Sequence, residues 1–199
     1  MKKFELTAEF VTNVFGKKLF RIKALVAFGD VEKGELGGFI EKEDNLSHDD
    51  NAWVCGDAQV CGDARVCGNA QVCGDARVCG NAQVSGNAQV FGNARVCGDA
   101  QVCGDAQVCG DAWVCGNAWV SGNADYAVVA GFGRYFRTTT FFRCKDKILR
   151  VQCGCFYGDL AQFRKIVKKT HGDSKYAKEY LAIADLMELH FSDECGGEQ

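Results

Sequence analysis

Residues 51–122 read NAWVCG DAQVCG DARVCG NAQVCG DARVCG NAQVSG NAQVFG NARVCG DAQVCG DAQVCG DAWVCG NAWVSG, twelve hexads of the form [Asn/Asp]-Ala-x-Val-[Cys/Ser/Phe]-Gly without an insertion. Alanine and valine keep their positions throughout, and the x position holds only Gln, Arg or Trp. A period this strict predicts a solenoid, in which every copy stacks on its neighbours.

The hexad also predicts which side chains face inward. Side chains alternate along a strand, so Ala and Val share one face while x and Cys share the other. If x pointed inward, Arg65, Arg77 and Arg95 would be buried without partners, at a prohibitive cost. Ala and Val therefore face the axis. The Gly-[Asn/Asp] pair makes the corner, because Gly adopts positive φ freely and Asn or Asp tolerates the left-handed region.

The motif Val-x-Gly-[Asn/Asp]-Ala-x resembles the hexapeptide repeat of the left-handed parallel β-helix superfamily, which includes bacterial acyltransferases. The lead-in formed by residues 37–40 and 44–47 resembles that of a divergent, transferase-like branch. The resemblance implies three hexads per triangular coil, hence about four coils and a prism roughly 19 Å tall. A flatter coil of two hexads, as in insect antifreeze proteins, stays open.

The flanking regions are predicted to be smaller units. Residues 1–50 read as an N-terminal β cap with strands at 3–10, 18–27 and 38–40; the β-helix covers 51–125; and residues 126–199 form a C-terminal ββαα unit. In that unit, strands at 135–144 and 148–156 flank a turn, Asp159 begins one helix that Gly172 ends, and a second helix covers about 174–191. The helix residues expected to be buried are Leu160, Phe163, Ile166, Val167, Tyr176, Tyr180, Ile183, Ala184 and Met187. The fold class is thus mainly β.

Stacking every eighteenth residue predicts three outer faces. They carry, in turn, Trp53, Gln71, Gln89 and Gln107; Gln59, Arg77, Arg95 and Trp113; and Arg65, Gln83, Gln101 and Trp119. The three tryptophans fall in terminal coils, where they would pack on the caps, although an aromatic platform for a ligand is the alternative. The residues proposed for an interaction face are Arg77, Arg95, Trp113 and Trp119.

The thirteen cysteines form the second unusual feature. Three-sided stacking predicts the columns Cys61, Cys79, Cys97 and Cys115; Cys55, Cys73, Phe91 and Cys109; and Cys67, Ser85, Cys103 and Ser121. Parallel Cβ vectors disfavour disulfides along a column, so we expect reduced thiols that pack beside the corners. Metal binding by a thiol ladder is the alternative, as is a zinc site at Cys144, Cys153 and Cys155 with His171.

Acyl transfer is the enzymatic alternative, and it would use acetyl-CoA or a related acyl-CoA. The family's enzymes need a histidine as general base. The hexads contain none, and His48, His171 and His190 lie outside them. His48 is expected to be a solvated loop residue, so no catalytic residue is transferred from the resemblance and no cofactor is expected.

The net charge of −3 is unevenly distributed, because residues 134–178 hold 12 basic and 3 acidic side chains. The basic side chains that could form an anion-binding patch are Arg143, Lys145, Lys147, Arg164, Lys165, Lys168 and Lys169; a merely solvated surface is the alternative. The chain shows no recognised nucleic-acid motif, no long apolar run and no export signal, so we expect a cytoplasmic protein. The expected function is a non-enzymatic scaffold that binds a protein partner or itself, with a homotrimer as one form.

Overall fold

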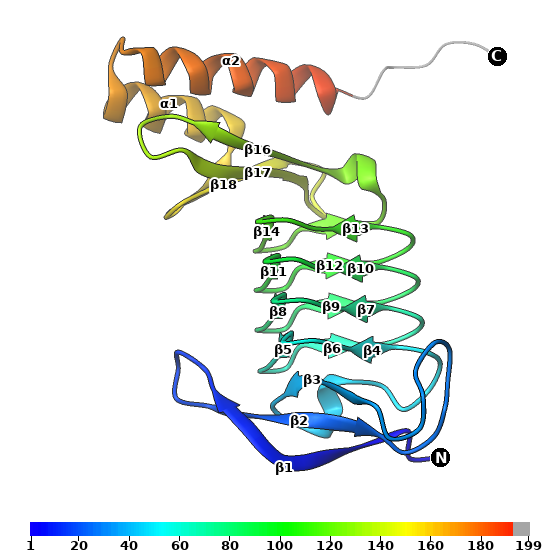
Figure 1. Cartoon of the computed structure of the whole chain (residues 1–199). Helices are drawn as coiled ribbons and strands as arrows, with labels where there is room; N and C mark the ends of the chain where they lie inside the picture. Colours follow the sequence, from blue (N-terminus) through cyan, green and yellow to red (C-terminus); the bar gives the residue numbers. More distant parts are fainter. Residues whose placement is uncertain (193–199) are drawn as a thin grey trace, which may run out of the picture. The chain divides into compact units, whose positions relative to one another are not determined.

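The computed structural model describes residues 1–192 (Figure 1). The chain divides into two compact units, Met1–Asn123 and Ala124–Gln199. The first contains the hexads and the segment before them, and the second contains a sheet and two helices. Neither helix within residues 1–192 has the length and apolar composition needed to cross a membrane.

Each hexad contributes one strand of two residues. The strands are β4 (Trp53–Val54), β5 (Gln59–Val60), β6 (Arg65–Val66), β7 (Gln71–Val72), β8 (Arg77–Val78), β9 (Gln83–Val84), β10 (Gln89–Val90), β11 (Arg95–Val96), β12 (Gln101–Val102), β13 (Gln107–Val108), β14 (Trp113–Val114) and β15 (Trp119–Val120). They stack in parallel as three sheets, each joining every third strand. Val66, Val84 and Val102, for example, are successive rungs of one sheet. The three-sided coil is confirmed, and the two-hexad alternative is wrong.

The interior of the coils consists of the alanines and valines of the hexads. All of them are at most 1% exposed, from Ala52 to Val120. Backbone hydrogen bonds join each coil to the next, as between the Gln83 amide and the Ala100 carbonyl at 2.9 Å. Because polar backbone groups pair between coils, a narrow core of small side chains suffices. The predicted inward face is confirmed.

The corners need glycine for two reasons. Gly80 has a φ of 74°, and a Cβ atom there would lie 3.0 Å from the Gly98 amide nitrogen of the next coil. The Asn and Asp that follow do not adopt positive φ, so that part of the corner prediction was wrong. They form side-chain ladders instead: the Asn69 amide donates to Asn87 at 3.1 Å, and Asn87 donates to Asp105 at 2.9 Å.

The segment before the hexads adds a fifth, irregular turn to the four regular coils. Its strands are β1 (Phe4–Thr12), β2 (Lys18–Ala24) and β3 (Leu36–Ile40), followed by the short 3-10 helix η1 (Glu43–Asn45). The three strands are antiparallel, but β3 also pairs in parallel with β5, so the cap continues one face of the solenoid (Figure 1). Leu46 likewise bridges Val66 on a second face.

Buried polar groups attach this turn to the first coil. Lys3 is 3% exposed, and its ammonium donates to the carbonyls of Asp49, Asp50 and Ala52. Asn45, fully buried, donates to the carbonyls of Gly62 at 3.0 Å and Ala64 at 2.8 Å. The N-terminal segment is therefore part of the solenoid's hydrogen-bonded structure.

The second unit contains two more strands than predicted. Its antiparallel sheet has the order β16 (Tyr126–Phe132), β17 (Arg137–Arg143), β18 (Leu149–Cys153) and β19 (Phe156–Asp159), followed by α1 (Leu160–His171) and α2 (Lys175–His190). The predicted ββαα unit is thus a ββββαα unit. The central hairpin β17–β18 is confirmed, as is the start of α1, where Asp159 accepts from the Gln162 amide at 2.7 Å.

One side of each helix packs on the sheet. The buried residues of the shared core include Phe141, Val151, Phe163, Val167, Tyr180, Ile183 and Met187. The predicted burial of Ile166 and Tyr176 was wrong, because each is 37% exposed. Ile166 lies at the edge of the apolar stripe of α1, and Tyr176 lies in the first turn of α2.

Candidate functional site

One face of the solenoid gathers most of the predicted interaction residues. Sheet pairing stacks Gln59, Arg77, Arg95 and Trp113 in consecutive coils, and we call these four side chains the arginine face. The Arg95 guanidinium carbon lies 5.6 Å from the centre of the Trp113 ring, a cation–π contact. Trp119, 49% exposed, lies on the sheet of β12 and β15, which is a different face. The structure therefore brings together three of the four predicted residues.

The two arginines are neighbours of like charge. Among residues 1–192, no carboxylate forms an ion pair with Arg77 or Arg95. Both side chains are exposed. At the spacing of adjacent β-strands, two unit charges repel each other by about 1 kcal/mol in bulk water. The arginine face thus presents a local concentration of positive charge on a segment that holds only three basic residues.

Trp53, in contrast, is a structural residue. It is 3% exposed and makes an edge contact with Phe28 at 5.3 Å between ring centres. The prediction that this tryptophan packs on the N-terminal cap is confirmed.

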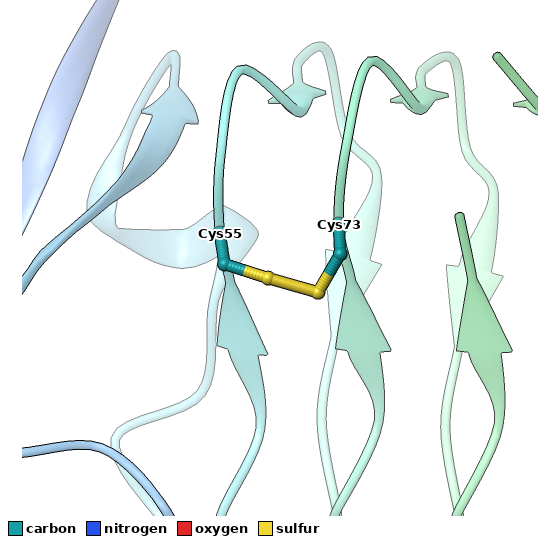
Figure 2. The surroundings of a disulfide bond; sticks show 2 residues. All are labelled: Cys55 and Cys73. Carbon is teal, nitrogen blue, oxygen red and sulfur yellow. A yellow bond between two sulfur atoms is a disulfide. The ribbon is translucent and has the colours of Figure 1, made fainter. Parts of the chain in front are cut away.

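The column of Cys55, Cys73, Phe91 and Cys109, which we call the first column, contains a disulfide. Cys55 and Cys73 occupy adjacent coils, with their Cα atoms 4.7 Å apart, and their sulfur atoms are bonded (Figure 2). The expectation that column disulfides are disfavoured was therefore wrong, as was the expectation of reduced thiols for this pair. The Cα distance lies within the usual range, and Figure 2 shows the two side chains turned toward each other from parallel backbone segments.

Another column holds four cysteines that form no disulfide with one another, Cys61, Cys79, Cys97 and Cys115, and we call it the four-thiol column. Neighbouring thiols in it hydrogen-bond to one another. The Trp113 indole N–H also donates to Cys97 Sγ at 3.2 Å. The bonds from Cys115, Cys79 and Trp113 lower the pKa of Cys97, whereas the bonds with Cys61 and Cys97 raise the pKa of Cys79. Hydrogen bonding along the column therefore shifts the pKa values of neighbouring thiols in opposite directions.

Cys61 ends the column beside a small cavity of about 140 Å³. Its lining residues are Thr12, Asn13, Val14, Phe15, Gln59, Cys61, Arg77 and Cys79. The pKa of Cys61 is lowered to about 7, mainly by the hydrogen bond from Cys79. The Asn13 amide and the Lys17 ammonium also lower this pKa, whereas burial and the charge of Glu41 raise it. Asn13 Nδ2 lies 3.8 Å from Cys61 Sγ. A nucleophilic thiolate is therefore accessible near neutral pH.

The third column behaves differently because serines separate its cysteines. Cys67 and Cys103 alternate with Ser85 and Ser121, so no two thiols occupy adjacent coils. The Trp119 indole donates to Cys103 Sγ at 3.4 Å. This column provides an internal control for the other two.

The prediction that His48 is a solvated loop residue was wrong. Its ring stacks on Phe4 at 4.3 Å, its Nδ1 accepts from the Lys3 amide at 3.2 Å, and its Nε2 lies 3.7 Å from a Glu43 oxygen. These contacts fix the first strand against η1. An open cavity of about 470 Å³ lies beside it and is also lined by Arg65. Both ring nitrogens of His48 thus lie near protein groups, while its side chain also lines this cavity.

The predicted zinc ligands in the second unit do not meet. Cys153, Cys155 and His171 line a cavity of about 200 Å³, and Thr139 donates to Cys153 Sγ at 3.2 Å. Cys144 lies at the other end of the hairpin, about 17 Å along the strand from Thr139, which pairs with Cys153. Burial raises the pKa of Cys144 to about 11. In the part of the chain that the structure describes, no three His, Cys, Asp or Glu side chains are grouped to hold a metal ion.

Ion pairs neutralise part of the proposed anion patch. Arg164 binds Asp185 and Glu188, both at 2.7 Å. Arg143 lies 3.8 Å from Asp125 and donates to the Phe191 carbonyl. The basic side chains of this set that remain exposed are Lys145, Lys147, Lys165, Lys168 and Lys169. Anion binding by these lysines remains a prediction.

Comparison with known families identifies the repeats. Residues 58–74, 70–86, 82–98, 88–104 and 106–122 match the YdcK beta solenoid repeat, each match covering close to one coil. No curated protein matches the chain. The matched residues coincide with strands β5–β15, whose stacking and buried Ala and Val side chains are described above. The coiled segment therefore carries the β-solenoid repeat of the YdcK family.

Proposed function

We propose that this chain is a β-solenoid scaffold that binds an acidic segment of a protein partner on the arginine face. The main support is the stacking of two arginines, which form no ion pair with a carboxylate among residues 1–192, beside a tryptophan on a regular sheet. Arginine and tryptophan are the residue types that most often dominate binding energy at protein interfaces.

The regular core favours recognition over catalysis. Inward-facing Ala and Val fill the coils, and each coil is hydrogen-bonded to the next. Such a face changes little on binding, which keeps the entropic cost of association low. Carboxylates placed over Arg77 and Arg95 would also relieve their mutual repulsion, and this contribution should weaken as salt screens it.

The test is a titration with a ten-residue oligoglutamate peptide labelled with a fluorophore. We expect saturable, salt-sensitive binding to the native protein. The double variant Arg77→Gln/Arg95→Gln should weaken that binding at least tenfold. Glutamine occupies the same hexad position in neighbouring coils, so the variant should keep the fold. Arg65→Gln, on a different face, is the matched control and should bind like the native protein.

Three results would count against the proposal. Equal loss in the control would show a general charge effect, and tighter binding of an oligonucleotide than of the peptide would indicate nucleic acid. A discrete oligomer in light scattering that dissociates in the Arg77→Gln/Arg95→Gln variant would indicate self-association through the arginine face, for example as a homotrimer. Calorimetric binding of acetyl-CoA would favour the acyltransferase alternative that the hexapeptide resemblance implies.

A further inference from the structure

The four-thiol column repeats the backbone arrangement that already supports a disulfide. In the first column, the Cys55 amide donates to the Val72 carbonyl at 2.9 Å, which sets Cys55 and Cys73 in register. In the four-thiol column, the corresponding bonds from Cys61, Cys79 and Cys97 are 3.0, 2.9 and 3.0 Å. Hydrogen bonding between neighbouring thiols also shifts the pKa values of Cys61, Cys79 and Cys97, as expected for side chains stacked in register. The geometry that accommodates one disulfide is therefore present three more times.

Cys61, at the N-terminal end of the four-thiol column, also has the features of an attacking thiol. Cys61 is half-buried, lies in a small cavity with Cys79 beside it, and receives a hydrogen bond from Asn13. Thiol–disulfide exchange is fastest when the attacking thiol has a pKa near the ambient pH, and that of Cys61 is about 7.

We propose that the four-thiol column is a thiol–disulfide exchange site for small anionic disulfides, with Cys61 as the attacking thiol and Cys79 as the resolving thiol. The lining of the cavity beside Cys61 includes Arg77 and the exposed Val14 and Phe15 of the β1–β2 turn. A disulfide with carboxylate groups, such as glutathione disulfide, would place one carboxylate near Arg77 and its sulfur atoms near Cys61, with the rest of the molecule outside the cavity. This activity goes beyond the scaffold function and does not depend on it.

The exchange proceeds in two balanced steps. The Cys61 thiolate attacks one sulfur of RSSR, which forms a Cys61–SR mixed disulfide and releases RS⁻. Cys79 then loses its proton and attacks the Cys61 sulfur, which forms Cys61–Cys79 and releases the second RS⁻. Two cysteine thiols are oxidised and one disulfide is reduced to two thiols. Cys97 and Cys115 form the second pair by the same steps, so full oxidation consumes all four thiols in two disulfides.

The experiment uses the whole protein, reduced with a phosphine, desalted and mixed with glutathione disulfide. After quenching with N-ethylmaleimide, trypsin cleaves at Lys42, Arg65, Arg77, Arg95 and Arg134. A Cys61–Cys79 disulfide then links peptides 43–65 and 78–95, and a re-formed Cys55–Cys73 bond joins peptide 66–77 to the same species. Fragmentation by tandem mass spectrometry assigns a Cys97–Cys115 bond among the four cysteines of peptide 96–134. A Cys79–Cys97 disulfide would instead link 78–95 to 96–134. We expect the first pattern, formed at least ten times faster than Cys103 reacts.

Variants separate the roles of the thiols. Cys61→Ser should slow oxidation at Cys79 at least tenfold, and Cys79→Ser should trap glutathione on Cys61. Serine is tolerated at this hexad position, as Ser85 and Ser121 show, and Cys103→Ser is the matched control without effect. Arg77→Gln should slow the reaction with glutathione disulfide about fivefold, because one close ion pair in water contributes about 1 kcal/mol. The same substitution should leave the reaction with the neutral 2-hydroxyethyl disulfide unchanged.

The proposal is overturned if the column thiols react no faster than Cys103, or if they end as four separate mixed disulfides with glutathione. No peptide partner is present in these assays, so their failure would leave the docking of acidic segments on the arginine face unaffected.

Discussion

Val84→Ala tests the packing of the solenoid interior most directly. Val84 is fully buried and lies between Val66 and Val102 in the adjacent coils. The substitution removes two carbon atoms, which costs about 1.6 kcal/mol at about 0.8 kcal/mol for each buried carbon. The hydrogen bond from Ser85 to the Val102 carbonyl, at 2.9 Å, keeps the coils from collapsing into the gap, so a cavity term of about 1 kcal/mol adds to the loss.

We therefore expect the free energy of unfolding to fall by about 2.5 kcal/mol. A urea titration followed by circular dichroism should show this as a midpoint lowered by about 1 M, with an unchanged slope. The matched control is Gln83→Ala, whose side chain is exposed on the outer face of the same strand. The control should change stability by less than about 0.5 kcal/mol. Equal effects of the two substitutions would refute the view that valine fills the axis.

Three further predictions concern the disulfide, the attacking thiol and the cap. The Cys55–Cys73 bond closes a loop with a sequence separation of 18, so Cys55→Ser/Cys73→Ser should lower the free energy of unfolding by about 3 kcal/mol in urea titrations without reductant; equal stability would contradict this. The rate of alkylation of Cys61 by iodoacetamide should rise with pH around a midpoint of about 7, because the lowered pKa lets the reactive thiolate form at lower pH than in an ordinary cysteine. A midpoint near 9 would show that the column does not stabilise the Cys61 thiolate. Asn45→Ala removes the three side-chain hydrogen bonds of a fully buried residue and should lower the free energy of unfolding by about 3 kcal/mol, measured by thermal or urea unfolding. Asn51→Ala, at an exposed residue, should be nearly neutral.

Most of the solenoid could be predicted because its sequence leaves few alternatives. The charge of Arg65, Arg77 and Arg95 forces the x position outward, and the uninterrupted period then determines which residues stack. The fifth turn was harder to foresee, because β3 and Leu46 join the stack without the hexad pattern. In the second unit, β16 is mostly exposed and β19 has only four residues, so neither has a clear alternation of apolar and polar side chains.

The candidate sites could be predicted only in part. Stacking by eighteens placed Arg77, Arg95 and Trp113 together and defined the thiol columns. Whether two stacked thiols bond depends on side-chain rotation, which the sequence does not specify, so the bond between Cys55 and Cys73 was missed. The cavity at Cys61 was also missed, because Asn13 and Phe15 reach it from a turn more than forty residues away in the chain.

The stacking of residues separated by 18 positions also governs how such a protein can change in length. Deleting residues 75–92 would remove one whole coil and set Cys97 directly beside Cys61, so every remaining residue would stay on its own face. Deleting a single hexad, such as residues 81–86, would turn all later coils by one third of a revolution. Arg95 would then follow Gln71, and Cys97 would follow Cys73. Insertions and deletions that keep each residue on its face are therefore confined to multiples of three hexads. The Ala and Val core would accept any number of hexads, because every hexad contributes the same two buried side chains.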